Sequence, residues 1–119
     1  MSQLQRKRVL LVEDEAVIAF AVEDMLLDLG CEVVGPAFRL EDAVEMAGAE
    51  MIDAAILDVN LNEQRSYAVA DELRRRGIPF LFATGYGEDG VDWGEAKPAI
   101  LAKPYRKDQI AAALGRLLD

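Results

Sequence analysis

Short apolar runs alternate along this chain with stretches in which apolar residues recur at helical spacing. The runs are continuous rather than alternating, which is typical of parallel strands buried on both faces of a sheet. The predicted strands are residues 8–12, 32–38, 54–57, 79–83 and 99–102. The predicted helices are residues 16–29, 40–49, 66–76 and 108–118. Strands joined by crossover helices predict an α/β fold, with a parallel sheet covered by helices on both faces.

One segment breaks this alternation, between the predicted fourth and fifth strands. Gly85, Gly87, Gly90 and Gly94 fall where another helix belongs. Each glycine costs a helix about 1 kcal/mol relative to alanine. We therefore expect this helix to be short, frayed or absent in the resting state. A long surface loop is the alternative interpretation.

Composition and charge limit the classes of function. The 119 residues suit one domain, residues 1–119. The 13 basic and 22 acidic side chains give a net charge of −9, which argues against direct nucleic-acid binding. The basic run at 74–76 is interpreted as the solvated end of a helix. No apolar run approaches the roughly 20 residues of a membrane span and no signal peptide opens the chain, so a cytoplasmic protein without membrane contact is expected.

The chain contains no histidine and a single cysteine, Cys31. These counts exclude a disulfide framework, a cysteine-rich zinc site and histidine-dependent catalysis. They also exclude a phosphohistidine carrier. Any chemistry must come from carboxylates, hydroxyls, lysine and the backbone.

Five polar residues fall at the carboxyl ends of predicted strands: Glu13, Asp14, Asp58, Thr84 and Lys103. Ligands of open parallel sheets bind beyond these ends. Clustered carboxylates without histidine or cysteine favour a hard cation such as Mg²⁺. Taken singly, Glu13 and Asp14 could cap a helix, Asp58 and Thr84 could be turn residues, and Lys103 could be a surface charge. Their shared position at one sheet edge favours a functional site.

In order and spacing, these residues resemble the motif of the receiver domains of two-component response regulators, with Lys103-Pro104 as its last element. The resemblance covers the whole chain. It implies a flavodoxin-like, doubly wound five-stranded parallel sheet in the order 2-1-3-4-5. It also implies that Asp58 accepts a phosphoryl group from a phosphohistidine on a partner histidine kinase.

The same resemblance implies a Mg²⁺ site around Asp58. Asp14 would hold the ion directly, Glu13 would hold it through water, and the backbone carbonyl of Asn60 would complete the protein ligands.

The resemblance further implies roles for residues at the ends of the last two strands. Thr84 would move toward the phosphoryl group and Lys103 would pair with it. The peptide bond between Lys103 and Pro104 would be cis.

A narrower resemblance is to the FAT GUY receivers of alphaproteobacteria, through Phe82-Ala83-Thr84-Gly85-Tyr86 and Lys103-Pro104-Tyr105. Ordinary receivers place an aromatic rotamer switch three residues before the lysine, where this chain has Ile100. They also carry Met-Pro shortly after the phosphoacceptor, where this chain has residues 61–64. We therefore expect Tyr86 to take the aromatic's place, in a switch that also includes Gly85, Ile100, Pro104 and Tyr105.

The resemblance predicts a monomeric single-domain response regulator that is not a turnover enzyme. Its partner would be an HWE or HisKA2 type histidine kinase or a histidine phosphotransferase, and the resemblance suggests a link to general stress signalling. Because the chain stops at Asp119, we expect no output domain, with a fragment of a larger regulator as the alternative. The partner face would combine residues 85–94, the fifth strand and the last helix, with Tyr105 and Arg106 at its edge.

Other functions remain open at this point. The output could be a protein contact, a phosphate sink or an intermediate step of a phosphorelay. A pseudo-receiver that binds partners without phosphorylation is one rival. An aspartyl-phosphate phosphatase is another, but Asn60 stands where such enzymes carry a second acid.

Overall fold

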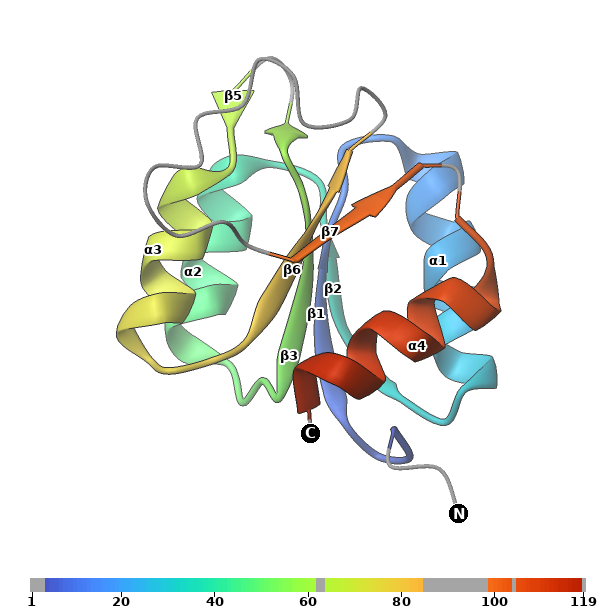
Figure 1. The fold of residues 1–119 in the computed structure, drawn as a ribbon. Helices are drawn as coiled ribbons and strands as arrows, with labels where there is room; N and C mark the ends of the chain where they lie inside the picture. Colours follow the sequence, from blue (N-terminus) through green and yellow to red (C-terminus); the bar gives the residue numbers. More distant parts are fainter. Residues whose placement is uncertain (1–3, 62–63, 85–98, 104, 119) are drawn as a thin grey trace.

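A five-stranded parallel sheet forms the centre of the molecule (Figure 1). The computed structural model describes residues 4–61, 64–84, 99–103 and 105–118. The sheet has the order β2-β1-β3-β6-β7. Its strands are β1 (Arg8–Val12), β2 (Glu32–Ala37), β3 (Ala54–Asp58), β6 (Phe80–Thr84) and β7 (Ala99–Ala102). Numbered by these five strands alone, the order is 2-1-3-4-5, so the predicted sheet is confirmed.

In the part of the chain that the structure describes, two helices cover each face of the sheet. The helices are α1 (Ala16–Asp28), α2 (Leu40–Ala49), α3 (Tyr67–Arg75) and α4 (Lys107–Leu118). Figure 1 shows α2 and α3 on one face and α1 and α4 on the other. Each face has its own apolar core, with Phe82 in the first and Ile56 in the second. This two-sided burial explains why the strand sequences are continuously apolar.

The central strand β3 is buried along its whole length. It pairs with β1 on one side, Leu57 opposite Val12, and with β6 on the other, Asp58 opposite Ala83. Asp58 therefore lies at the end of the most enclosed strand of the sheet, one residue beyond the last pair with β1 and still paired with β6.

Several predicted boundaries shift by one or two residues. Asp58 is the last residue of β3 and pairs with Ala83, and Thr84 is the last residue of β6 and pairs with Ala102 of β7, whereas the sequence placed both residues just beyond their strands. The second strand ends at Ala37, and α3 spans Tyr67–Arg75 instead of residues 66–76. A short antiparallel hairpin of β4 (Asn60–Leu61) and β5 (Gln64–Arg65) was not predicted, because two-residue strands leave no periodic pattern.

Two predictions lie outside the described residues. They are the short or disordered helix within residues 85–98 and the cis peptide between Lys103 and Pro104. Within the described part of the chain, the peptide between Gly35 and Pro36 is cis. None of the described helices combines the length and the apolar character needed to cross a membrane.

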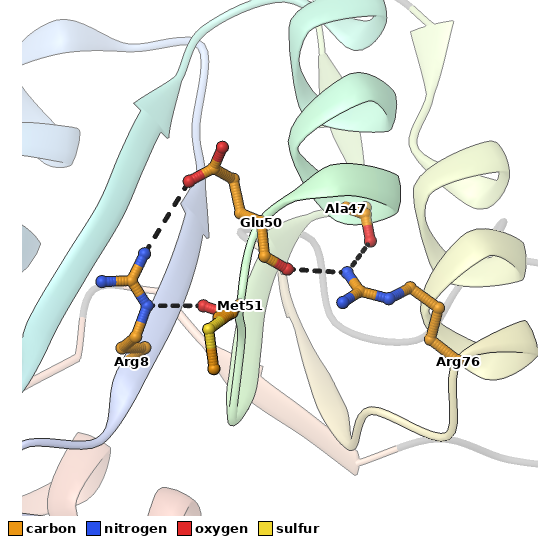
Figure 2. A network of polar contacts seen from close by, with 5 residues as sticks. All are labelled: Arg8, Ala47, Glu50, Met51 and Arg76. Atoms are coloured by element: carbon orange, nitrogen blue, oxygen red, sulfur yellow. Dashed lines mark hydrogen bonds and ion pairs between the residues drawn. The ribbon is translucent and has the colours of Figure 1, made fainter.

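Two arginines hold the turn between α2 and β3 at the amino edge of the sheet (Figure 2). Arg76 donates from one guanidinium nitrogen to the carbonyls of Ala47 and Glu50, at 2.6 and 2.8 Å. Arg8 donates to the carbonyl of Met51 at 2.6 Å and lies 3.7 Å from the Glu50 carboxylate. These bonds satisfy carbonyls at the end of α2 that have no partner within the helix.

Candidate functional site

The carboxylates predicted from the sequence meet at the carboxyl edge of the sheet. Glu13 and Asp14 directly follow β1, whose last residue pairs with Leu57 immediately before Asp58. One oxygen from each of Glu13, Asp14 and Asp58 lies within 4.8 Å of the others. The parallel register of β1 and β3 therefore brings together acids that are far apart in the chain.

This cluster is largely removed from solvent. The exposed fraction is 2% for Glu13, 8% for Asp58 and 3% for Thr84. The Glu13 carboxylate accepts a bond from the backbone N–H of Glu15 at 3.1 Å, which orients it at the start of α1. Buried carboxylates need a positive partner, because charge is costly in a low-dielectric environment.

Lys103 supplies that partner from the end of β7. Its ammonium nitrogen lies 2.5 Å from Glu13 Oε1 and 3.2 Å from Asp58 Oδ2. Its backbone N–H donates to the carbonyl of Thr84 at 2.9 Å, which fixes the two strand ends side by side. The structure thus brings together the predicted Glu13, Asp14, Asp58, Thr84 and Lys103.

The charged side chains of the site carry an excess of negative charge. Burial, and then hydrogen bonding with and repulsion by Glu13, raise the pKa of Asp58 to about 8, while Lys103 offsets part of this effect. Burial disfavours the charged form of Lys103, but its bond to Glu13 and the charge of Asp58 raise the pKa of its ammonium group overall. One lysine therefore does not balance the three acids.

The donor set fits Mg²⁺. All three side chains offer oxygen, and the close spacing of these oxygens would be stabilised by a divalent cation. Mg²⁺ keeps several waters when bound, which leaves room for substrate oxygens. Asn60 lies in β4, two residues after Asp58, and the role of its carbonyl stays a prediction.

The other predicted switch residues are only partly described. Ile100 is partly buried in β7 and pairs with Phe82. Tyr105 is buried, with 8% of its surface exposed, and burial followed by the charges of Glu13 and Asp58 raises the pKa of its hydroxyl. Gly85, Tyr86 and Pro104 lie outside the described residues.

An apolar groove of about 510 Å³ adjoins the site and was not predicted. Its lining includes Val17, Ala21 and Met25 of α1, together with Lys103 and Tyr105. The apolar character of α1 continues outside the groove, since Phe20 is 53% exposed. The sequence did carry a signal for this surface, because α1 has apolar residues on every side and a core-packed helix needs them on only one.

The doubly wound sheet, with three acids and a lysine gathered at its carboxyl edge, defines a class of α/β domain with a candidate cation site. Comparison with known families names this class. Residues 9–115 match the response regulator receiver domain family. The chain belongs to this family.

The similar proteins include regulators and isolated receivers. The phyllosphere-induced regulator PhyR of Methylorubrum extorquens is 32% identical over 114 residues, which are 92% of this chain and 43% of PhyR. This chain therefore spans less than half of that relative. The solution structure of SdrG from Sphingomonas melonis Fr1 is 42% identical, with both chains fully covered and a TM-score of 0.83.

A third comparison bears on the metal. The receiver domain of the sensor histidine kinase PA1611 from Pseudomonas aeruginosa has a magnesium ion coordinated in its active site cleft. It is 27% identical to this chain, with 95% of this chain and 98% of that one covered and a TM-score of 0.83.

Proposed function

We propose that this receiver domain accepts a phosphoryl group on Asp58 in a Mg²⁺-dependent two-component phosphorelay, and that the modification changes its binding to a partner protein. The observation that carries the proposal is the position of Asp58: it ends the buried central strand, 3.2 Å from the Lys103 ammonium group and within 4.8 Å of two other acids. Phosphoryl transfer depends mainly on positioning and charge neutralisation, and this arrangement provides both.

In the proposed transfer, an Asp58 oxygen attacks the phosphorus of a phosphohistidine. The new phosphorus–oxygen bond forms as the phosphorus–nitrogen bond breaks, and the imidazole leaves with the bonding electron pair. Lys103 moves from Glu13 toward the new phosphoryl oxygens, and the Thr84 hydroxyl donates to another of them. Water later attacks the phosphorus of the acyl phosphate, which releases inorganic phosphate and restores the Asp58 carboxylate. In this proposal the domain acts as a phosphoacceptor in signalling and not as a turnover enzyme.

The metal ligands in this proposal are Asp14, Asp58 and the carbonyl of Asn60, with Glu13 acting through water. The ion would neutralise charge on the transferred phosphoryl group. The acid cluster and the magnesium in the PA1611 receiver support this assignment.

The proposed donor is an HWE or HisKA2 type histidine kinase or a histidine phosphotransferase. The α1 groove supports docking of such a partner beside the site. Residues 16–28 contain three acids and no base, so the matching surface would present apolar side chains flanked by lysine or arginine. Membership of the FAT GUY subgroup and a role in general stress signalling are parts of the same proposal, supported by the motif at 82–86 and the likeness to PhyR.

Treatment with acetyl phosphate and Mg²⁺ tests the proposal. Intact mass should increase by one phosphoryl group, and the gain should disappear in Asp58→Asn or when the metal is chelated. Asp71→Asn, on the outer surface of α3, is the matched control and should label like the wild type. Full labelling of Asp58→Asn would overturn the assignment.

A further inference from the structure

Ser66 has a buried hydroxyl without a hydrogen-bond partner. Its exposed fraction is 0%, and within the described part of the chain no donor or acceptor pairs with its Oγ. Buried hydroxyls are almost always paired, because an unpaired one loses its bonds to water and gains nothing in exchange. Such a group in a folded protein calls for a physical explanation.

The position of Ser66 makes the missing bond more informative. Ser66 immediately precedes α3, and serine at this position usually accepts a bond from the N–H two or three residues later. That geometry requires an extended backbone, whereas Ser66 has φ −88° and ψ 21° and makes no side-chain cap. Its carbonyl instead accepts the N–H groups of Val69 and Ala70, at 3.1 and 3.3 Å. Ser66 is therefore a residue type suited to cap α3, but its side chain makes no capping hydrogen bond.

Backbone hydrogen bonds connect Ser66 to the candidate site. The N–H of Ser66 donates to the carbonyl of Val59 at 2.9 Å, and the N–H of Val59 donates to the carbonyl of Ala83 at 3.2 Å. Val59 directly follows Asp58, and Ala83 directly precedes Thr84. A shift of Asp58 can therefore reach the start of α3 through one hydrogen bond, and a shift of Thr84 through two.

Aromatic packing makes a second connection to the same helix. The ring of Tyr67, the first residue of α3, packs edge-on against Phe82 with centroids 6.3 Å apart. Phe82 lies two residues before Thr84, on the same face of β6, and is 1% exposed. Packed interiors shift between discrete arrangements. A movement of Thr84 would therefore displace Phe82 and the Tyr67 ring that packs on it.

We propose that Ser66 is a capping switch for α3. In the resting state the Val69 N–H bonds the Ser66 carbonyl and the hydroxyl is unpaired. When Asp58 carries a phosphoryl group, the Ser66 backbone becomes extended and its hydroxyl accepts the Val69 N–H. The start of α3 is then better ordered, and this helix reports the state of the site. The inference rests on the proposed phosphorylation of Asp58.

The test compares wild type with Ser66→Ala and Ser66→Cys, each with and without Mg²⁺ and fluoroberyllate, an acyl-phosphate mimic. Ser66→Cys keeps a buried side chain of similar size but hydrogen-bonds only weakly. In the resting state both variants should melt about 4 °C higher than wild type, because the unpaired hydroxyl is gone. On activation, amide exchange at residues 68–70 should slow about tenfold in wild type and stay nearly unchanged in both variants.

Two results would overturn the switch. One is a lower melting temperature for both variants in the resting state, which would show that the hydroxyl is already paired there. The other is equal protection of residues 68–70 in wild type and variants after activation. Intact mass after acetyl phosphate treatment separates this failure from that of the proposed function: labelled Asp58 without the exchange pattern refutes the switch alone, and unlabelled wild type refutes both.

Discussion

The Lys103 ammonium nitrogen lies 2.5 Å from Glu13 Oε1, so a single ion pair joins the end of β7 to the end of β1. The same nitrogen is farther from Asp58, at 3.2 Å. In the resting state Lys103 is therefore directed mainly at an acid that is not the proposed phosphoacceptor. A phosphoryl group on Asp58 would compete with Glu13 for this lysine.

Replacing Lys103 with Met should tighten Mg²⁺ binding, by about tenfold, because a positive charge that competes with the ion for the acids is removed. The same variant should lose the conformational response to phosphorylation. Titration calorimetry measures the first effect and amide exchange the second. Lys107→Met is the control, since Lys107 is exposed and pairs with Asp28 on α1. Weaker Mg²⁺ binding by Lys103→Met would contradict the electrostatic account.

The raised pKa of Asp58 predicts that the metal-free protein becomes less stable as pH rises. In the folded protein this carboxyl keeps its proton up to about pH 8, whereas its ordinary pKa is 3.8. Between these values the folded state binds more protons than the unfolded state, so the free energy of unfolding falls with rising pH. The contribution is complete below about pH 4 and lost above about pH 8.

Thermal melts across this pH range measure the effect. Asp58→Asn should flatten the decline and raise the melting temperature at pH 8, and Mg²⁺ should do the same for the wild type by neutralising the acids. A variant that melts with the same pH profile as the wild type would show that Asp58 is not the group responsible.

The α1 groove predicts that partner docking and phosphoryl chemistry are separable. Val17 is 84% exposed at the groove, and Val17→Glu would place a charge where an apolar contact is expected. Phosphotransfer from the cognate kinase should slow about tenfold or more, while labelling by acetyl phosphate should not change. Met51→Glu is the matched control, because Met51 is 76% exposed at the opposite edge of the sheet. Equal slowing by both variants would argue against a specific surface.

The hydrogen bonds of Arg76 predict that its replacement lowers the stability of the protein without impairing phosphorylation of Asp58. Arg76→Met should lower the free energy of unfolding by about 2 kcal/mol, because the carbonyls of Ala47 and Glu50 lose a charged donor. Arg75→Met removes only the exposed pair with Glu72 and should leave denaturant unfolding unchanged. Both variants should still be labelled at Asp58, since the hydrogen bonds of Arg76 lie at the other end of β3. Loss of labelling in folded Arg76→Met would indicate that the two edges are coupled.

The sequence by itself determined which elements form and which residues stand at their ends. Strand and helix signals are local, because they depend on the burial of neighbouring residues and on glycine or proline at the boundaries. The same local logic places Asp58 after Ala54–Leu57 and Lys103 after Ala99–Ala102. Since the carboxyl ends of parallel strands share one edge, the cluster of acids followed from chain order alone.

Only the tertiary structure decided which partner each side chain contacts and which groups have none. The preference of Lys103 for Glu13, the unpaired hydroxyl of Ser66 and the open apolar face of α1 all depend on distances between residues that no sequence period relates. Those distances are set by strand register and by the packing of helices on both faces, where a shift of one ångström makes or breaks a hydrogen bond. Ser66 illustrates the difference: its sequence position predicts the start of a helix, whereas the burial of its unpaired hydroxyl is visible only in the folded structure.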